Sequence, residues 1–229
     1  MSSATTAEPY VPTRSASPAA GWLLPIGGLL FFAGGMLHPN EDRPGARMAQ
    51  KLLVMYVDPT WYPAHTLMLV GVACMATALV VLVRRRSLAV NFTAHKTAAV
   101  AAVAATMAVP ATLLHLIAAT DADRINDHLS TPPSDFLLIV ETITAPGFGF
   151  SIAALALVGA VTRTLGSRVA AVFGVVGGIG YGLAGGTAIF TDLFDPLFPT
   201  AIGIAVWAII AGIGWMRRPT ASVTTGSRI

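Results

Sequence analysis

The sequence is poor in cysteine and in charged residues. Only 11% of its 229 residues are charged and 55% are hydrophobic, whereas about a quarter of the residues of a soluble domain are charged. The single cysteine, Cys74, cannot form an internal disulfide, and a metal site built from cysteines is excluded. The chain also lacks a Walker sequence, a Gly-x-Ser-x-Gly elbow and an HxxxH or HExxH pair. No motif therefore assigns an enzyme class.

Long apolar runs take the place of these features. Because backbone groups in hydrocarbon must be hydrogen-bonded within the segment, each run is expected to be a helix. The runs cover residues 21–37, 64–83, 97–119, 136–161, 169–191 and 197–216. We predict an all-α integral membrane protein: a bundle of six transmembrane helices over residues 21–217. Disordered tails are predicted at 1–20, rich in Ser, Thr, Ala and Pro, and at 218–229.

Basic residues are concentrated in alternate connections between the runs. One set of flanks carries Arg14, Arg84, Arg85, Arg86, Lys96, Arg163, Arg168, Arg217 and Arg218. The other connections carry most of the acids, including Asp121, Asp123, Asp192 and Asp195. By the positive-inside rule both termini are predicted to be cytoplasmic. The net charge of +3 is explained by these flanks, so we predict a lipid bilayer and no nucleic acid as partner. The Ala-, Val- and Gly-rich spans suit the cytoplasmic membrane of a bacterium.

The first outer connection, between the first two runs, contains an amphipathic stretch. Residues 46–57 place Met48, Leu52, Met55 and Tyr56 on one helical face, after Pro44 and before Asp58-Pro59. We expect a short helix lying in the outer membrane interface. Trp61 and Tyr62, which follow, have the positions of interfacial anchors.

Glycines recur every four residues in the fifth run. Gly174, Gly178, Gly182 and Gly186 form one face, and small residues let helix backbones approach closely in a membrane. This face is expected to pack within the bundle, or alternatively to bind a second copy or another membrane protein.

Four polar residues are predicted to lie at a similar shallow depth on the outer side. His38 ends the first run, His65 begins the second, His115 is near the outer end of the third, and Glu141 is near the start of the fourth. Ionisable groups within membrane spans are costly and indicate function by default. His95 and His128 are expected to be solvated loop residues instead.

Three kinds of site are compatible with this set. Imidazole and carboxylate ligands suit a transition-metal ion. Two histidines on facing helices can hold a haem. Histidine and glutamate can also relay or sense protons, because imidazole titrates near neutral pH. Ordinary boundary residues remain the alternative.

At the level of function, the sequence indicates a multi-pass membrane protein of unassigned activity with a candidate metal- or haem-binding site at His38, His65, His115 and Glu141. The alternatives are a small permease or channel, which needs a polar path that the inner halves of the spans hardly supply, and an assembly partner that binds through the glycine-rich fifth helix.

Overall fold

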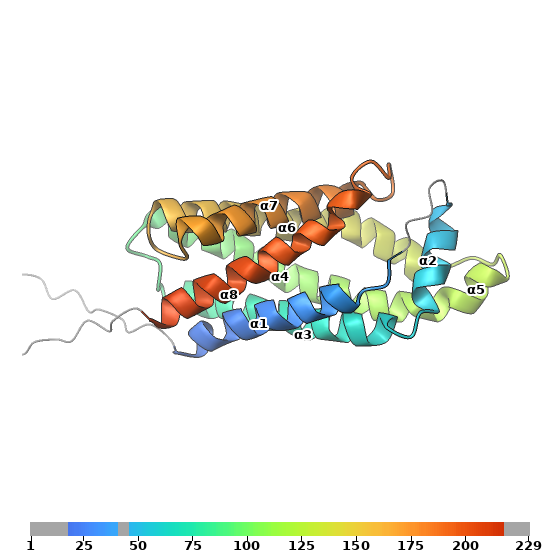
Figure 1. Cartoon of the computed structure of the whole chain (residues 1–229), viewed down its shortest axis with the longest axis horizontal. Coiled ribbons are helices and arrows are strands. Elements are labelled where there is room, and N and C mark those ends of the chain that lie inside the picture. Colours follow the sequence, from blue (N-terminus) through green and yellow to red (C-terminus); the bar gives the residue numbers. More distant parts are fainter. Residues whose placement is uncertain (1–17, 41–45, 218–229) are drawn as a thin grey trace, which may run out of the picture.

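The computed structural model describes residues 18–40 and 46–217, which fold into helices with no β-strand among them. The long helices are α1 (Pro18–Leu37), α3 (Trp61–Arg84), α4 (Phe92–Ala118), α6 (Pro132–Val161), α7 (Arg168–Thr187) and α8 (Ile202–Met216). The short ones are α2 (Met48–Tyr56), η1 (Ala119–Asp121), α5 (Ala122–Asn126) and η2 (Asp195–Ala201). The long helices run side by side along one axis, while α2 lies across one end of the bundle, beside α5 (Figure 1).

Five helical segments of the described chain are long and apolar enough to cross a membrane. They are Trp61–Arg84, Phe92–Asn126, Pro132–Val161, Arg168–Thr187 and Asp195–Met216, while the apolar part of α1, Gly21–Leu37, is shorter. The prediction of an all-helical protein with several membrane-length helices is therefore confirmed. The count of six spans and their orientation stay predictions.

Several predicted boundaries need correction. Helices α3 and α4 begin three and five residues before their predicted spans, at Trp61 and Phe92. Helix α1 begins at Pro18, so residues 18–20 belong to a helix and not to the predicted tail; the rest of both predicted tails lies outside the described residues. Helix α7 ends at Thr187, four residues before the predicted end of its span. Pro132 and Pro133 open helix α6, because proline at the first helical positions gives up an N–H that has no helical partner there.

The six long helices form a closed ring. Helices that follow one another in the chain pack together, in the order α1, α3, α4, α6, α7 and α8, and α8 then packs against α1. Short connections between most of these helices account for this order. The ring encloses one large apolar core, which includes Met75, Leu79, Phe148, Ile152 and Trp207.

Small residues bring the helices of the ring close together. The predicted glycine face of α7 lies against α6: a Cβ on Gly178 would collide with the carbonyl of Gly149, and one on Gly174 would lie 2.6 Å from the Cβ of Ala156. Gly182 meets Phe150 and Gly186 meets Pro146. The face offered for either internal packing or a partner is thus occupied by a helix of the same chain.

A second, smaller apolar cluster closes the end of the bundle that carries α2. It contains Leu52 and Tyr56 of α2, Trp61 of α3, Ala118 and Ala119 at the end of α4, Ile125 of α5 and Leu137 of α6. The predicted short helix is confirmed as α2, but its apolar face packs on the protein, with Leu52 and Tyr56 buried. This end of the molecule comprises α2, η1, α5 and the first turns of α3 and α6. We call it the row end, because the candidate site described next is a row of side chains that lies there.

Candidate functional site

The four residues predicted at shallow depth come together at the row end. His38 directly follows α1, His65 is in the second turn of α3, His115 is in the last turn of α4, and Glu141 is in the third turn of α6. Four separate segments of chain therefore contribute one polar side chain each. We call His38, His65, His115 and Glu141 the histidine row.

The side chains follow one another in the order His38, His65, His115, Glu141. The ring centroids of His38 and His65 are 4.9 Å apart in an edge-on contact. Those of His65 and His115 are also 4.9 Å apart, with the ring planes inclined by only 19°. Nε2 of His115 lies 3.6 Å from Oε2 of Glu141. The arrangement is a line of rings that ends at a carboxylate.

Backbone carbonyls fix the tautomers of the two inner histidines. Nδ1 of His65 lies 2.9 Å from the carbonyl oxygen of Trp61, and Nδ1 of His115 lies 3.1 Å from that of Ala111. A carbonyl oxygen can only accept, so Nδ1 is the donor in both rings. In a neutral ring the lone pair is then on Nε2. Nε2 of His115 faces a carboxylate oxygen of Glu141, so in the neutral ring two lone pairs face each other and repel. A proton or another cation between the two atoms removes this repulsion.

The row is largely shielded from solvent. His65 is 1% exposed, and the side chains of His115 and Glu141 are 18% and 17% exposed. His38 is half-buried at the outer limit of the row. Burial, and the positive charge that His115 can carry nearby, lower the pKa of His38 below its ordinary value, so this imidazole is held in its neutral form.

The donor types in the row suit a transition metal, but their directions do not converge. A metal lies in the plane of an imidazole along the lone pair of the ligating nitrogen, about 2.1 Å away. The stacked rings of His65 and His115 have nearly parallel planes, so their lone pairs cannot meet at one ion unless a ring turns. The same stacking leaves no slot for a haem between the two rings. Within residues 18–40 and 46–217, no three His, Cys, Asp or Glu side chains form a group that could hold a metal ion.

Trp61, which the sequence predicts to be a membrane anchor, belongs to the site. Its ring centroid lies 3.8 Å from that of His65 and 5.6 Å from that of His38. Its Nε1–H donates to the backbone carbonyl of His115 over 3.1 Å. Trp61 is 2% exposed, whereas its neighbour Tyr62 is 48% exposed and has the exposure expected of an anchor.

A buried polar network holds Trp61 from the other side. The ring of Tyr56 contacts that of Trp61 edge-on at 4.8 Å, and its hydroxyl donates to Oγ of Ser134 over 3.3 Å. Oδ2 of Asp121 accepts from the N–H and the hydroxyl of Ser134, over 2.9 and 3.0 Å. Burial raises the pKa of Tyr56 to about 12, so the phenol stays protonated and can donate. The network joins α2, η1 and the first turn of α6.

A second attachment joins α2 to the segment between α7 and η2. Nζ of Lys51 lies 3.0 Å from Oδ1 of Asp192 and 3.1 Å from Oδ2 of Asp195. Burial alone would lower the pKa of Lys51, but the hydrogen bonds to the two carboxylates outweigh it and raise the pKa. We call these three residues the lysine clamp.

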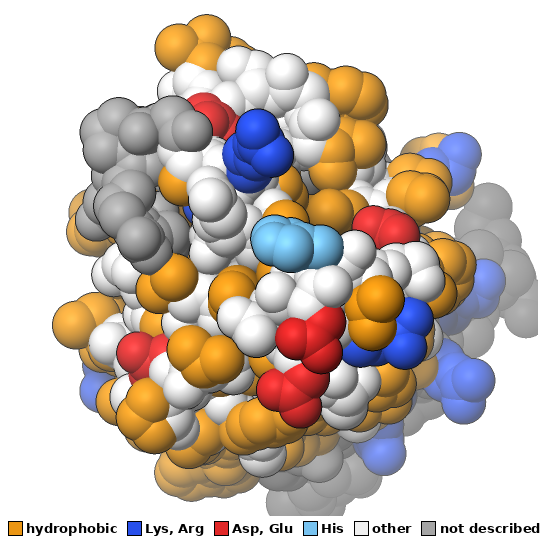
Figure 2. Space-filling view, turned by 90° about the vertical axis from the view of Figure 1, so that its right-hand side faces the viewer, with side chains coloured by type: hydrophobic (Ala, Val, Ile, Leu, Met, Phe, Trp, Pro, Cys, Tyr) orange, Lys and Arg blue, Asp and Glu red, His pale blue; other side chains and the backbone are white. Residues whose placement is uncertain are grey.

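Figure 2, which faces the row end, shows acidic, basic and imidazole surfaces among hydrophobic ones.

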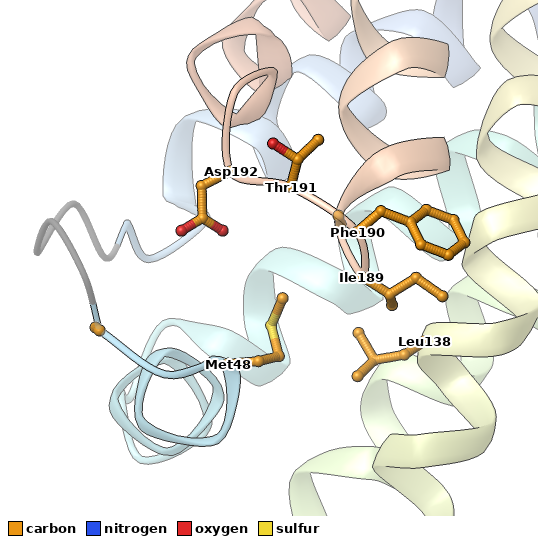
Figure 3. A pocket seen from close by; sticks show the side chains of 8 residues that line it. Met48, Leu138, Ile189, Phe190, Thr191 and Asp192 are labelled. Atoms are coloured by element: carbon orange, nitrogen blue, oxygen red, sulfur yellow. The ribbon is translucent and has the colours of Figure 1, made fainter.

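A cavity of about 400 Å³ lies beside the clamp. Met48 of α2, Leu138 of α6 and Ile189 after α7 line it with apolar surface, and Thr191 and Asp192 lie on its polar side (Figure 3). The cavity lies between the beginning of α2, the second turn of α6 and the chain that follows α7.

The remaining histidines lie outside the row. His128 is an exposed residue after α5, as predicted, but His95 is in the first turn of α4 and is half-buried, so the prediction of a loop position was wrong for it.

The sequence matches no protein-family model and no curated protein, and the structure matches no solved structure.

Proposed function

We propose that the protein crosses the membrane six times, with both termini in the cytoplasm and the row end outside. Helix α1 is the sixth member of the ring: its 20 residues have a length of about 30 Å, the thickness of the hydrocarbon core. The Arg- and Lys-containing connections α3–α4 and α6–α7 are at the end opposite the row, as the positive-inside rule requires. The composition of the spans favours the cytoplasmic membrane of a bacterium.

Within this protein, the function that the geometry supports best is the binding and release of a proton at the histidine row. The observation that carries it is the line of three imidazoles ending at Glu141, with Nε2 of His115 3.6 Å from the carboxylate. The fixed Nδ1–H tautomers leave Nε2 of His115 as the basic nitrogen that faces Glu141. A proton can be held between these two groups, and His65 and His38, which follow in the row, lie close enough to change its affinity electrostatically.

A transition-metal ion is the second candidate. It is favoured because Nδ1–H of His65 and of His115 each donates to a carbonyl, the orientation that metal-ligating histidines have. His38, His65, His115 and Glu141 would supply the ligands after a rotation of the His65 ring. A haem would need a wider separation of the two stacked rings.

The other two functions have less support. A permease needs a continuous polar path, but beyond the row end the buried polar residues of the described chain are Ser151 and Thr164, and the apolar core fills the ring. An assembly role through Gly174, Gly178, Gly182 and Gly186 needs a free glycine face, and this face packs against α6.

The test is a pH titration of the histidine rings by NMR, with the protein labelled at the imidazole nitrogens and held in detergent micelles. We expect the ring of His115 to titrate within about pH 5–8, the range of histidine switches. In Glu141→Gln the midpoint of His115 should fall by about one pH unit or more, because a favourable negative charge is lost.

Asp135→Asn is the matched control. It removes a carboxylate from the same helix at an exposed position in the first turn, and it should leave the midpoint of His115 unchanged. A His115 ring that stays neutral throughout, or one whose midpoint ignores Glu141→Gln, would exclude the proton site. Stoichiometric Zn²⁺ binding that disappears in His65→Ala/His115→Ala would favour the metal instead.

A further inference from the structure

The indole of Trp61 and the backbone around it contact every histidine of the row, each in a different way. The carbonyl oxygen of Trp61 accepts the Nδ1–H of His65, and its Nε1–H donates to the carbonyl of His115. Its ring lies over the ring of His65 and beside that of His38. An interfacial anchor needs none of these contacts, because its ring lies among lipid headgroups.

We propose that Trp61 is the positioning residue of the histidine row, which sets the orientation of His65 and the affinity of the row for a proton. The proposal deepens the proposed proton site and rests on it for the proton affinity, although not for the orientation.

Two physical effects follow from the geometry. The first is steric: a ring centroid 3.8 Å from that of His65, with the planes inclined by 38°, leaves the imidazole little room to turn away from His115. The second is electrostatic: the negative face of an indole attracts a cation, and tryptophan does so most strongly of the aromatic side chains. Trp61 therefore favours the protonated form of the row.

The other titratable groups around His65 come from every side of the site. They are His38 after α1, His115 on α4, Glu141 on α6 beyond His115, and Tyr56 on α2 behind Trp61, with Tyr181 on α7 near Glu141. The positive charges that His38 and His115 can carry oppose protonation of His65, and Glu141 favours protonation of the row. Trp61 is the uncharged member of this set that contacts His65, His38 and the backbone of His115 together.

Two substitutions separate the contributions of the ring and of its N–H. Trp61→Leu removes the aromatic face and the Nε1–H donor. Trp61→Phe keeps an aromatic face over His65 and removes only the donor to His115. Tyr62→Leu is the matched control, because Tyr62 is the next residue, is aromatic and is exposed.

The first readout is the proton chemical shift of the His65 ring, which is displaced upfield by the current in a ring stacked on it. The part of this displacement that Trp61 causes should be large in the wild type, smaller in Trp61→Phe and absent in Trp61→Leu, where the stacked ring of His115 supplies the remainder. The second readout is the pH midpoint of His115, whose ring centroid is 6.2 Å from that of Trp61. Trp61→Leu should lower the proton affinity of this ring about fivefold, and Trp61→Phe should retain most of the wild-type affinity.

The results separate this proposal from the proposed function. If the row does not titrate, the proton site is wrong, but the ring-current shift of His65 still tests the position of Trp61. The proposal would be overturned if the ring chemical shift of His65 were the same in the wild type, Trp61→Phe and Trp61→Leu. An equal change in Tyr62→Leu would overturn it too, because both residues would then act only as anchors. Should Trp61→Leu fail to fold, Trp61→Phe against Tyr62→Leu decides the same question.

Discussion

The body of the bundle and its row end are built by different physical means. In the body, glycine and alanine bring helix backbones together around an apolar core. The buried polar groups there have local partners: the hydroxyl of Ser151 donates to the carbonyl of Phe148, and that of Thr164 is hydrogen-bonded to the hydroxyl of Thr162. At the row end, the buried residues Asp121 and Ser134 are hydrogen-bonded across two segments, and the ring of buried His65 contacts the rings of His38 and His115 on two others. Burying polar groups costs free energy unless each is hydrogen-bonded. The contrast therefore points to the row end as the place where polarity serves a function.

The largest effect should come from adding volume to the body. A Cβ on Gly178 would collide with the carbonyl of Gly149 and lie 3.0 Å from Ala153, so α6 and α7 would have to move apart. We expect Gly178→Ala to lower the free energy of unfolding by about 3 kcal/mol, the upper part of the range for overpacking. Unfolding of the purified protein by a denaturing detergent measures this.

Gly147→Ala is the control within the same helix pair. Gly147 is exposed on α6, and a Cβ there meets no atom within 4 Å. Alanine is a better helix former than glycine by about 1 kcal/mol, so this variant should be as stable as the wild type or more stable. Equal stability of Gly178→Ala and Gly147→Ala would contradict the close α6–α7 contact.

The same contrast explains what could be predicted from the sequence. The apolar runs and the four-residue glycine period are local patterns, so the helices and the small-residue face were predictable. Their partners are not local: whether the face of Gly178 meets α6 or another chain depends on the closure of the ring. The span boundaries predicted only a similar depth for His65, His115 and Glu141; whether the side chains meet depends on the order of the helices in the ring. What they bind stays a proposal.

Trp61 shows where sequence reasoning reached its limit. A tryptophan at the start of a span is typical of an interfacial anchor, and Tyr62 beside it fits the same description. The hydrogen bond from Trp61 to the carbonyl of His115 joins residues 54 positions apart, and it depends on how α3 packs against α4. Trp61 lies four residues before His65, so the two side chains are neighbours on one face of a helix. This spacing was the one local signal that could have suggested a contact between them.

An intermediate effect is expected from the buried network at the row end. Asp121 is 2% exposed and accepts two hydrogen bonds from Ser134 in the first turn of α6. Asp121→Ala leaves the buried N–H of Ser134 without this acceptor and removes a negative charge from the N-terminus of a helix. The free energy of unfolding should fall by about 2 kcal/mol.

Asp123→Ala is the matched control for this substitution. Asp123 is an exposed residue of α5, two positions away, and its loss should change stability by no more than about 0.5 kcal/mol. If Asp121→Ala and Asp123→Ala are equally mild, hydrogen bonds do not hold the row end together, and the proposed contrast with the body is wrong.

The smallest effect is expected at the lysine clamp. Lys51 is a part-buried cation, with its side chain 12% exposed, and its partners Asp192 and Asp195 are 58% and 32% exposed. Exposed ion pairs contribute about 1 kcal/mol or less. Lys51→Gln should therefore leave global stability nearly unchanged but speed amide hydrogen exchange in residues 48–56 by about fivefold, because the clamp attaches α2 to the chain after α7 beside a cavity.

Salt and pH sharpen this last prediction. In about 1 M salt the Debye length is only ~3 Å, so exchange of α2 in the wild type should approach that of Lys51→Gln. The raised pKa of Lys51 means that its contribution is complete below the ordinary lysine value and is lost as the pH rises through the higher folded-state pKa. Lys96→Gln removes a lysine at the other end of the bundle and should leave α2 unaffected. If α2 exchanges equally in Lys51→Gln and the wild type at low salt, packing on Leu52 and Tyr56 holds it without the clamp, and the row end is closer in kind to the body than its polar contacts suggest.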